Sequence, residues 1–329
     1  MPDTGLDRPF DGIINFRDVG RTVNQFAGQE LLKEGVLFRS ARLDEASKED
    51  IRRITDDLHI SSIIDLRSTT EHQMAVKKYK RNNDIPTTTP TDSDPREEEE
   101  EGEGEGEAYI HLPSLENTDT RRHLISLTGK AFERQLLWRL DWWNFTKVLA
   151  YITSGYRQDA VRIVGENVMK PAGLTGLAMD TLEASAAEIK RVFDVFSSSL
   201  DMDADNGSSA PVPGSGSGIL VHCTQGKDRT GLIILLSLLL TGIVDAEVMA
   251  SEYVLSEKEL ENEPAGEKEE RMREIRALGL GEEYARCPKD FTERVTGFLR
   301  EKYGGARGYL EYIGVEERDI ESVRRRLLA

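Results

Sequence analysis

The feature that most constrains the fold of this chain is an eleven-residue segment, Val221 to Gly231, which reads VHCTQGKDRTG. The segment overlaps the end of a short, apolar and β-branched run, Gly218 to His222, which is typical of a buried strand. From Thr230 onward the chain reads TGLIILLSLLLTG, an apolar run of helical length. The sequence therefore predicts a buried strand that leads through a short loop into a buried helix.

The loop from Cys223 to Arg229 is predicted to bind an anion. A loop between a strand and a helix directs successive backbone N–H groups inward, and the positive end of the helix dipole adds to their field. The same field favours the thiolate form of Cys223, which makes the sulfur a usable nucleophile. Arg229 carries a planar fork that can bind two phosphoryl oxygens at once, also in a transition state whose charge is spread over them.

The remaining residues of the loop fit a two-step phosphate chemistry. The hydroxyl of Thr230 can donate to the sulfur when the sulfur becomes the leaving group, and glycines allow the backbone to close around a ligand. A nucleotide-binding GxxxxGK[ST] loop is excluded, because it would need glycine at Val221 and a hydroxyl at Asp228. The predicted phosphate-binding loop comprises Thr224, Gln225, Gly226, Lys227 and Thr230, with support from His222 and Gly231.

The segment matches the signature HCxxGxxR[ST]G of cysteine-dependent phosphatases at every required position. With Lys227 and Asp228 it resembles the HCxxGKDRTG form of a subfamily of bacterial and fungal tyrosine phosphatases, which includes enzymes that act on both proteins and phosphoinositides. Stretches that begin at Asn15, Leu37 and Ile63, and a glycine-rich stretch before the last helix, also resemble this subfamily. The resemblance covers most of the chain and implies a phosphatase without metal or cofactor.

Two interpretations are open for five charged residues in the N-terminal stretches. They either contact the substrate or form buried ion pairs that tie strands together. We favour the structural ion pairs, which are the ordinary interpretation. The five residues are Arg17, Asp18, Arg39, Asp65 and Arg67.

The chain has 329 residues, 38% of them hydrophobic, and the spread of its motifs predicts one domain over residues 1–329. The formal net charge is −17, but residues 84–107 alone hold eleven acids against one arginine, a balance of −10. This segment cannot bury apolar surface, so we predict a disordered surface insertion there. Residues 197–217 are predicted to be a flexible linker that ends just before the strand leading to Cys223.

The remaining sequence alternates strands and helices before it becomes mainly helical. Ser47 is predicted to cap a helix, and strands are predicted over residues 62–66 and 108–112. Helices are expected over most of residues 129–197 and beyond residue 242. These elements predict an α/β fold with a central sheet flanked by helices, a helical insertion and a helical C-terminal part.

The helical insertion is predicted over residues 130–178. Residues 180–183 then resemble a capping box for a helix over residues 181–196. Core packing is the ordinary explanation for the aromatic cluster in the insertion, and the alternative, which rests on the resemblance, is a mobile lid with an apolar inner face. The cluster consists of Leu136, Leu137, Trp138, Leu140, Trp142, Trp143 and Phe145.

The general acid that protonates the leaving oxygen stays open. The resemblance implies an aspartate about thirty residues before the cysteine, but that interval falls in a predicted helix whose acids are ordinarily solvated. An acid beside Arg229 either transfers the proton, orients the arginine or caps the helix. The candidates are Asp194 and Glu188 in the helix, Glu116 and Asp119 after the strand over residues 108–112, and Asp228 in the loop.

The most consistent function is hydrolysis of phosphomonoesters through a phosphocysteine intermediate on Cys223. Phosphotyrosine is the favoured substrate, because a phenol with a pKa of ~10 needs less acid assistance than an alcohol. Phosphoinositides are the alternative, since Lys227 beside Arg229 adds charge suited to a polyphosphorylated headgroup. A phosphate-binding module without turnover has no need of a thiolate, and a sulfur-transfer enzyme fits Thr230 and Gly231 less well.

The sequence also bears on location and partners. No signal peptide is predicted, because the first ten residues are acidic and contain proline. The most apolar segment, residues 232–244, is shorter than the ~20 residues that span a bilayer. The two cysteines are expected to stay unpaired in a reducing compartment, with Cys287 as a packing residue. We expect a cytoplasmic protein without a transmembrane segment, which acts on a phosphotyrosine protein or a phosphoinositide and binds no nucleic acid.

Overall fold

The computed structural model describes residues 9–82, 120–198, 218–263 and 265–329. At its centre is a five-stranded sheet in the order β1-β2-β5-β3-β4. β1 (Arg17–Asp18) is antiparallel to β2 (Leu37–Ser40), whereas β2, β5 (Gly218–His222), β3 (Ile60–Asp65) and β4 (Arg121–Leu124) run parallel to one another. The carboxyl ends of these four strands therefore meet at one edge of the sheet, where ligands bind in open α/β sheets.

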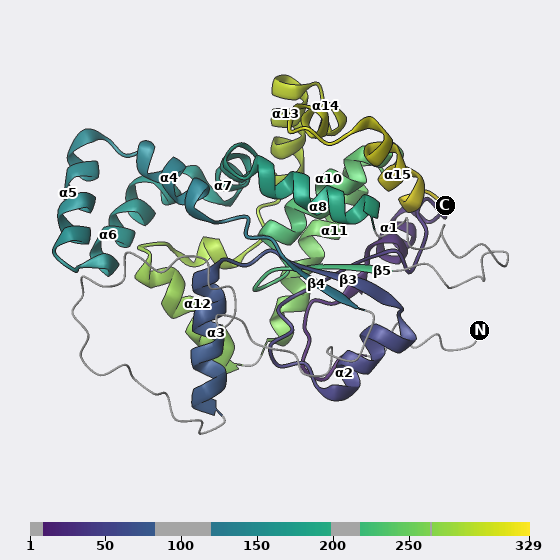
Figure 1. Cartoon of the computed structure of the whole chain (residues 1–329), viewed down its shortest axis with the longest axis horizontal. Helices are drawn as coiled ribbons and strands as arrows, with labels where there is room; N and C mark the ends of the chain where they lie inside the picture. The colour runs from purple at the N-terminus through teal and green to yellow at the C-terminus, as the bar shows by residue number, and fades with distance from the viewer. Residues whose placement is uncertain (1–8, 83–119, 199–217, 264) are drawn as a thin grey trace.

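Helices cover both faces of this sheet (Figure 1). On one face, Phe38, Ile63 and Leu220 pack with the apolar residues of α2 (Lys48–Arg52) and its neighbouring loops. On the other face, the apolar helix α10 lies in the main core, as expected for a buried helix behind the loop. This arrangement confirms the predicted α/β fold. The larger layer comprises α1 (Val19–Ala27), α8 (Ala186–Ser198), α10 (Asp228–Thr241), α11 (Ala246–Glu259), α13 (Phe291–Tyr303), α14 (Ala306–Tyr312) and α15 (Glu317–Leu327).

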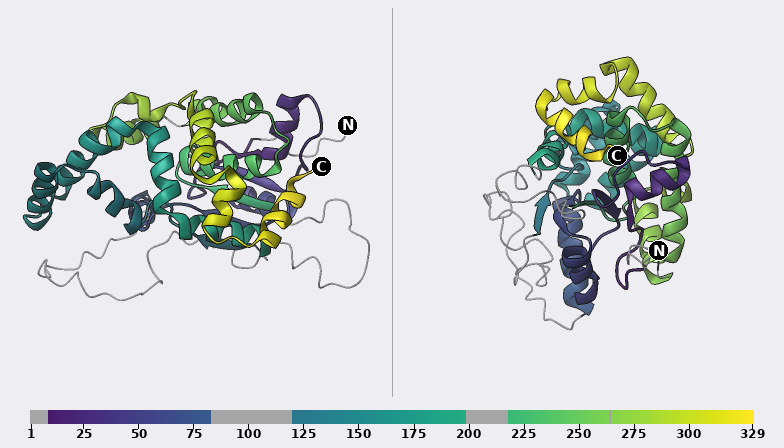
Figure 2. Two further views of the ribbon diagram at one scale, coloured as in Figure 1. Left: turned by 90° about the horizontal axis from the view of Figure 1, so that it is seen from above. Right: turned by 90° about the vertical axis from the view of Figure 1, so that its right-hand side faces the viewer.

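The remaining helices surround the edge where the parallel strands end. α3 (Thr69–Asn82) follows β3, and α12 (Ala265–Ala277) lies next to it (Figures 1 and 2). Between β4 and α7 the chain makes a helical excursion, in which α5 and α6 lie at the outer end of the molecule. The predicted helical insertion and helical C-terminal part are both present. The excursion consists of α4 (Lys130–Trp138), α5 (Trp142–Thr153) and α6 (Arg157–Val164), followed by a π-helical turn (Gly165–Met169) and α7 (Lys170–Ala184).

One predicted helix start is confirmed and one is wrong. The hydroxyl of Ser47 accepts from the backbone of Asp50, and the Asp50 carboxylate accepts from the backbone of Ser47, which is the predicted cap. Asp180, by contrast, lies inside α7, and its carboxylate pairs with Arg139. The helix breaks at Ser185 instead, where the hydroxyl donates to a carbonyl oxygen of the β4–α4 loop, and no glycine or proline marks this break in the sequence.

Strand β4 was not predicted from the sequence. Its residues, RRHL, are mostly polar because it is a partly exposed edge strand, so it lacks the apolar pattern on which strand prediction depends. The strand predicted over residues 108–112 and the acidic insertion lie outside the described residues. Of the predicted linker, residues 197 and 198 are the last residues of α8, and the rest also lies outside.

Candidate active site

The loop between β5 and α10 begins where the sequence predicts it. β5 is completely buried between β2 and β3, and its last residue, His222, pairs with both Ser40 and Asp65. Cys223 follows directly and is 3% exposed, while α10 begins at Asp228. The predicted strand, loop and helix are therefore confirmed, and the sulfur lies near the positive end of a long buried helix.

Two carbonyl groups of the loop are turned outward by hydrogen bonds to the scaffold. The side-chain amide of Asn15 donates to the carbonyl oxygens of Gln225 and Gly226, at 2.9 and 3.1 Å. Arg39 also donates to the carbonyl oxygen of Gly226, at 2.6 Å. In a trans peptide the carbonyl and the N–H point in opposite directions, so the next two N–H groups are directed into the loop. Inward N–H groups of this kind bind phosphate.

Gly226 and Thr230 fit their predicted roles, which are closure of the backbone around a ligand and donation of a hydroxyl. Gly226 has a φ of 66°, and a Cβ at this position would lie 2.1 Å from the carbonyl oxygen of Ser40, so only glycine fits. The hydroxyl of Thr230 is buried and has no hydrogen-bond partner among the described residues. It is therefore available to a ligand of the loop or to the sulfur of Cys223.

Glu71 of α3 binds the guanidinium of Arg229 with both of its carboxylate oxygens. Nη1 donates to Oε2 and Nη2 donates to Oε1, both at 2.6 Å, and Nη1 also donates to the hydroxyl of Thr128 at 3.3 Å. The hydroxyls of Thr224 and Ser68 donate to the same carboxylate. Burial alone would raise the pKa of Glu71, but the charge and hydrogen bonds of Arg229 outweigh it and hold this pKa well below its usual value. Glu71 thus fixes the orientation of the arginine fork.

The side chains of Lys227 and Asp228 contact segments outside the loop. Lys227 is completely buried, and its ammonium donates to the carbonyl oxygens of Tyr284 and Arg286, at 3.0 and 2.8 Å. The predicted role of its charge in phosphate binding is therefore wrong. Asp228 is one-third exposed and accepts from the hydroxyl of Tyr253 at 3.3 Å. Among the described residues no ion pair joins Asp228 to the neighbouring arginine, and its carboxylate lies 3.5 Å from the ammonium of Lys227 instead.

The residues that flank the loop, His222 and Gly231, are packed in the core. His222 is completely buried, and burial lowers its pKa to about 4, so the imidazole is neutral at neutral pH. A Cβ on Gly231 would lie 2.9 Å from the ring of Tyr253, which explains the glycine at this position.

Cys287 is unpaired and buried, and burial raises the pKa of its thiol to about 11, in agreement with the predicted packing role.

Arg17 and Arg39 meet at one carboxylate beneath the loop. Glu252 of α11 pairs with Arg17 at 2.9 Å and with Arg39 at 2.6 Å. Burial raises the pKa of Glu252, but the two arginines outweigh it, so the pKa is lowered and the carboxylate stays ionised. Because Arg39 also holds the carbonyl oxygen of Gly226, this buried network positions the loop.

Arg67 belongs to a second buried network, whereas Asp18 belongs to neither. Arg67 pairs with Asp65 at 3.0 Å and with Asp44 at 2.6 Å. Asp18 caps α1 and accepts from the backbone of Gly35 at 2.5 Å, and burial raises its pKa to about 6. The favoured structural interpretation therefore fits four of the five charged residues, and Asp18 is a helix cap instead.

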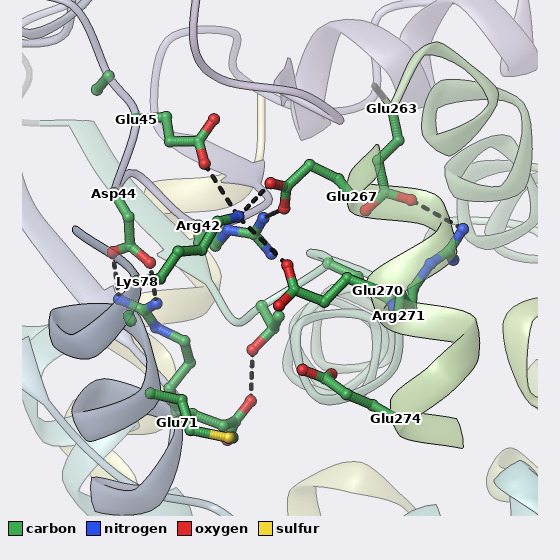
Figure 3. Close-up of a pocket in the computed structure, with 16 residues that line it drawn as sticks. Arg42, Asp44, Glu45, Glu71, Lys78, Glu263, Glu267, Glu270, Arg271 and Glu274 are labelled. Carbon is green, nitrogen blue, oxygen red and sulfur yellow. Dashed lines mark hydrogen bonds and ion pairs between the residues drawn. The ribbon is translucent and has the colours of Figure 1, made fainter. Parts of the chain in front are cut away.

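A cavity of about 400 Å³ opens beside the loop and is lined by Thr224 and Gln225. Figure 3 shows Arg42 and Lys78 on one side of it, both paired with Glu267 of α12. The acidic residues of its wall outnumber the basic ones, so the cavity carries a surplus of negative charge. The acids are Asp44, Glu45, Glu71, Glu263, Glu267, Glu270 and Glu274, and the bases are Arg42, Arg67, Lys78 and Arg271.

Three further expectations concern the acids, metal binding and the aromatic cluster. Asp194 pairs with Lys190 at 2.8 Å and is a solvated helix residue as expected, while residues 116 and 119 lie outside the described part. The described residues contain no group of three or more metal-ligating side chains. Core packing is wrong for all three tryptophans: Trp138, Trp142 and Trp143 are 76%, 72% and 75% exposed.

Sequence reasoning missed three residues that organise the loop. Glu252 has no motif around it, and its role appears only when α11 packs beneath β2. Asn15 and Glu71 lie in stretches that resemble the subfamily, but only the fold shows that they contact the loop and Arg229. A carboxylate shortly after a buried strand was the available signal for Glu71.

The model of the tyrosine phosphatase family matches residues 8–132 and 169–329 of this chain. A tyrosine-protein phosphatase of Nostoc commune is 38% identical over 118 residues, and the aligned region spans 33% of this chain and 38% of that protein. None of the helices in the described part is long and apolar enough to cross a membrane. Because the family match includes both the β5–α10 loop and the helix that supplies Glu71, this chain belongs to the tyrosine phosphatase family.

Proposed function

We propose that this chain hydrolyses phosphotyrosine in proteins. The sulfur of Cys223 attacks phosphorus, the P–O bond to the tyrosine breaks, and a phosphocysteine forms; water then attacks phosphorus and displaces the sulfur. The observation that carries the proposal is the clamp of Glu71 on Arg229, which presents a fixed cationic fork at the loop. Glu71 accepts one hydrogen from each Nη, so Nε–H and the second Nη2–H form the edge that binds two equatorial oxygens of the transferring phosphoryl group, with no reorganisation during the reaction.

The loop itself supplies the remaining charge stabilisation. Its N–H groups are directed inward because Asn15 and Arg39 hold the carbonyl oxygens outside. The hydroxyl of Thr230, which has no hydrogen-bond partner in the described part of the chain, is available to stabilise the sulfur when it leaves the phosphocysteine. These groups favour an enzyme over a phosphate-binding module without turnover. Such a module needs neither a thiolate nor a hydroxyl that donates to the thiolate.

Two observations favour a phosphotyrosine protein over a phosphoinositide. The phosphoinositide alternative rested on the charge of Lys227, but the ammonium of this residue is bound to backbone carbonyls and buried. The cavity beside the loop also carries more acids than bases, which repels a headgroup with several phosphates. A peptide with one phosphate carries less negative charge and meets less of this repulsion.

The proton donor of the first step is proposed to be Asp228. Its carboxylate is one-third exposed, and the residue directly precedes Arg229 in the chain. A chain with two unpaired cysteines, one of them the nucleophile, is suited to a reducing compartment, so we keep the proposal of an intracellular enzyme.

The experiment that tests this proposal compares Cys223→Ser with the native chain on a phosphotyrosine peptide. We expect turnover to be abolished while binding of the peptide is retained, because the loop and Arg229 remain. Turnover of several phosphoinositides is measured in parallel with the native chain. Substantial activity of Cys223→Ser would refute the mechanism, and faster turnover of a phosphoinositide than of the peptide would refute the substrate.

A further inference from the structure

The helical excursion carries a large exposed apolar surface. Of the twelve large hydrophobic side chains that are exposed in the described residues, eight lie between residues 138 and 161. A concentration of this kind marks an interaction site, because monomeric soluble proteins rarely expose extended apolar patches. We define the aromatic patch as Trp138, Trp142, Trp143, Leu149, Ile152 and Tyr156, which are 47% to 76% exposed.

Helix α5 shows why this surface needs a partner. Its sequence, WWNFTKVLAYIT, contains one charged residue, Lys147, so the helix is apolar on nearly every side. Only Val148 is buried, whereas Trp142 and Leu149, seven residues apart, share an exposed face. A helix that is hydrophobic all round is buried in its functional state. The ring of Trp138 stacks on Phe145 at 6.4 Å, which joins α4 to the same surface.

The charge around the patch is opposite to that of the whole chain. Residues 130–164 contain six lysines and arginines against three acids, a balance of +3 in a chain whose net charge is −17. Lys147 and Arg157 are exposed and form no ion pair among the described residues. Tryptophan and tyrosine with flanking cations are typical of surfaces that lie in the headgroup region of a membrane.

We propose that the aromatic patch docks on an anionic lipid surface. The tryptophans enter the headgroup region, and the flanking cations are attracted to the negative lipids. With only 12 residues, α5 is too short to span the bilayer and lies along its surface. The match to the family model stops at residue 132 and resumes at residue 169, so the patch lies outside the matched pattern. Membrane docking is therefore separable from the proposed hydrolysis.

Docking at this position also has a consequence for the substrate. Thr128, two residues before α4, contacts Arg229 of the phosphate-binding loop. The docked helices are thus directly connected to the loop, and docking brings the phosphatase site to proteins held at the membrane.

The three tryptophans of the patch are the only tryptophans of the chain, so tryptophan fluorescence, excited selectively, reports on the patch alone. The full chain is titrated with vesicles of 70% phosphatidylcholine and 30% phosphatidylserine, and with vesicles of phosphatidylcholine only. With the anionic vesicles we expect a blue shift of the emission, protection from an aqueous quencher, and at least tenfold stronger binding that weakens with salt. The neutral vesicles should give little change.

A pair of variants connects the signal to the patch. Trp142→Ser with Trp143→Ser should weaken vesicle sedimentation at least tenfold and leave turnover of a soluble aryl phosphate unchanged. The matched control is Tyr312→Ser, because Tyr312 is 72% exposed on α14, outside the patch, and its loss should change neither measurement.

The proposal would be overturned if the aromatic patch binds something other than a lipid surface. A blue shift that depends on protein concentration without lipid, together with a dimer mass in light scattering, would assign the patch to a second copy. A blue shift on addition of vanadate alone would assign it to closure over the phosphate-binding loop. The absence of any shift with anionic vesicles would refute membrane docking outright, whatever the outcome for the catalytic variants.

Discussion

Replacing Glu71 by glutamine tests whether the fixed arginine fork is what makes the loop catalytic. Glutamine has the same length as glutamate but keeps one acceptor oxygen and presents an N–H₂ group to the other nitrogen of Arg229. One of the two hydrogen bonds at 2.6 Å is therefore lost, together with the ion pair. We expect the arginine to lose its orientation while the loop and the nucleophile stay in place.

The expected loss follows from the geometry of the pair. A hydrogen bond to a charged group contributes about 1.5–3 kcal/mol, and both side chains are about one-fifth exposed, so solvent screening reduces this contribution to the lower half of the range. A loss of about 2 kcal/mol in the transition state corresponds to a decrease of roughly 30-fold in kcat/KM. The affinity for vanadate, which occupies the position of the transferring group, should fall in parallel.

The assay measures kcat/KM on an aryl phosphate for the native chain and for Glu71→Gln, with urea unfolding as a check on the fold. The matched control is Glu49→Gln, because Glu49 forms an ion pair with Arg52 of the same helix, α2, in which both side chains are about half exposed. We expect the control to keep full activity. A folded Glu71→Gln variant within threefold of native activity would show that Arg229 needs no clamp.

Three further outcomes are expected. Arg229→Lys should lose at least tenfold in kcat/KM, since a point charge cannot bridge two oxygens; a smaller loss argues against bidentate binding. Asp228→Asn should slow an alkyl phosphate more than an aryl phosphate if Asp228 is the acid, and equal losses exclude it. His222 has a folded pKa of about 4, below the unfolded value of ~6.5, so native stability should fall as the pH decreases through this window. Between pH 7 and 4.5 the unfolding free energy of His222→Gln, measured by urea titration, should decrease by about 2 kcal/mol less than that of the native chain. An equal decrease in both proteins would contradict a neutral buried histidine.

The strand, loop and helix that carry Cys223 and Arg229 could be predicted from the sequence alone. All of their signals are local: an apolar β-branched run, a short polar loop with glycine, and an apolar run of helical length. The cap at Ser47 was predictable for the same reason, because its partner lies three residues away. The buried face of α8 also follows from a local pattern, because its buried residues recur at helical spacing in the sequence: Ile189, Val192, Phe193 and Phe196.

Which distant groups organise the loop depends on how the elements pack in three dimensions. Glu71 and Arg229 are 158 positions apart, and Asn15 and Gln225 are 210 apart, so no local pattern pairs them. The direction of Lys227 depends on backbone carbonyls supplied by another segment, and the exposure of the tryptophans depends on where α5 lies relative to the core. A sequence records that a side chain is charged or aromatic, but burial and hydrogen-bond partners arise only when the elements pack, and these set what the side chain does.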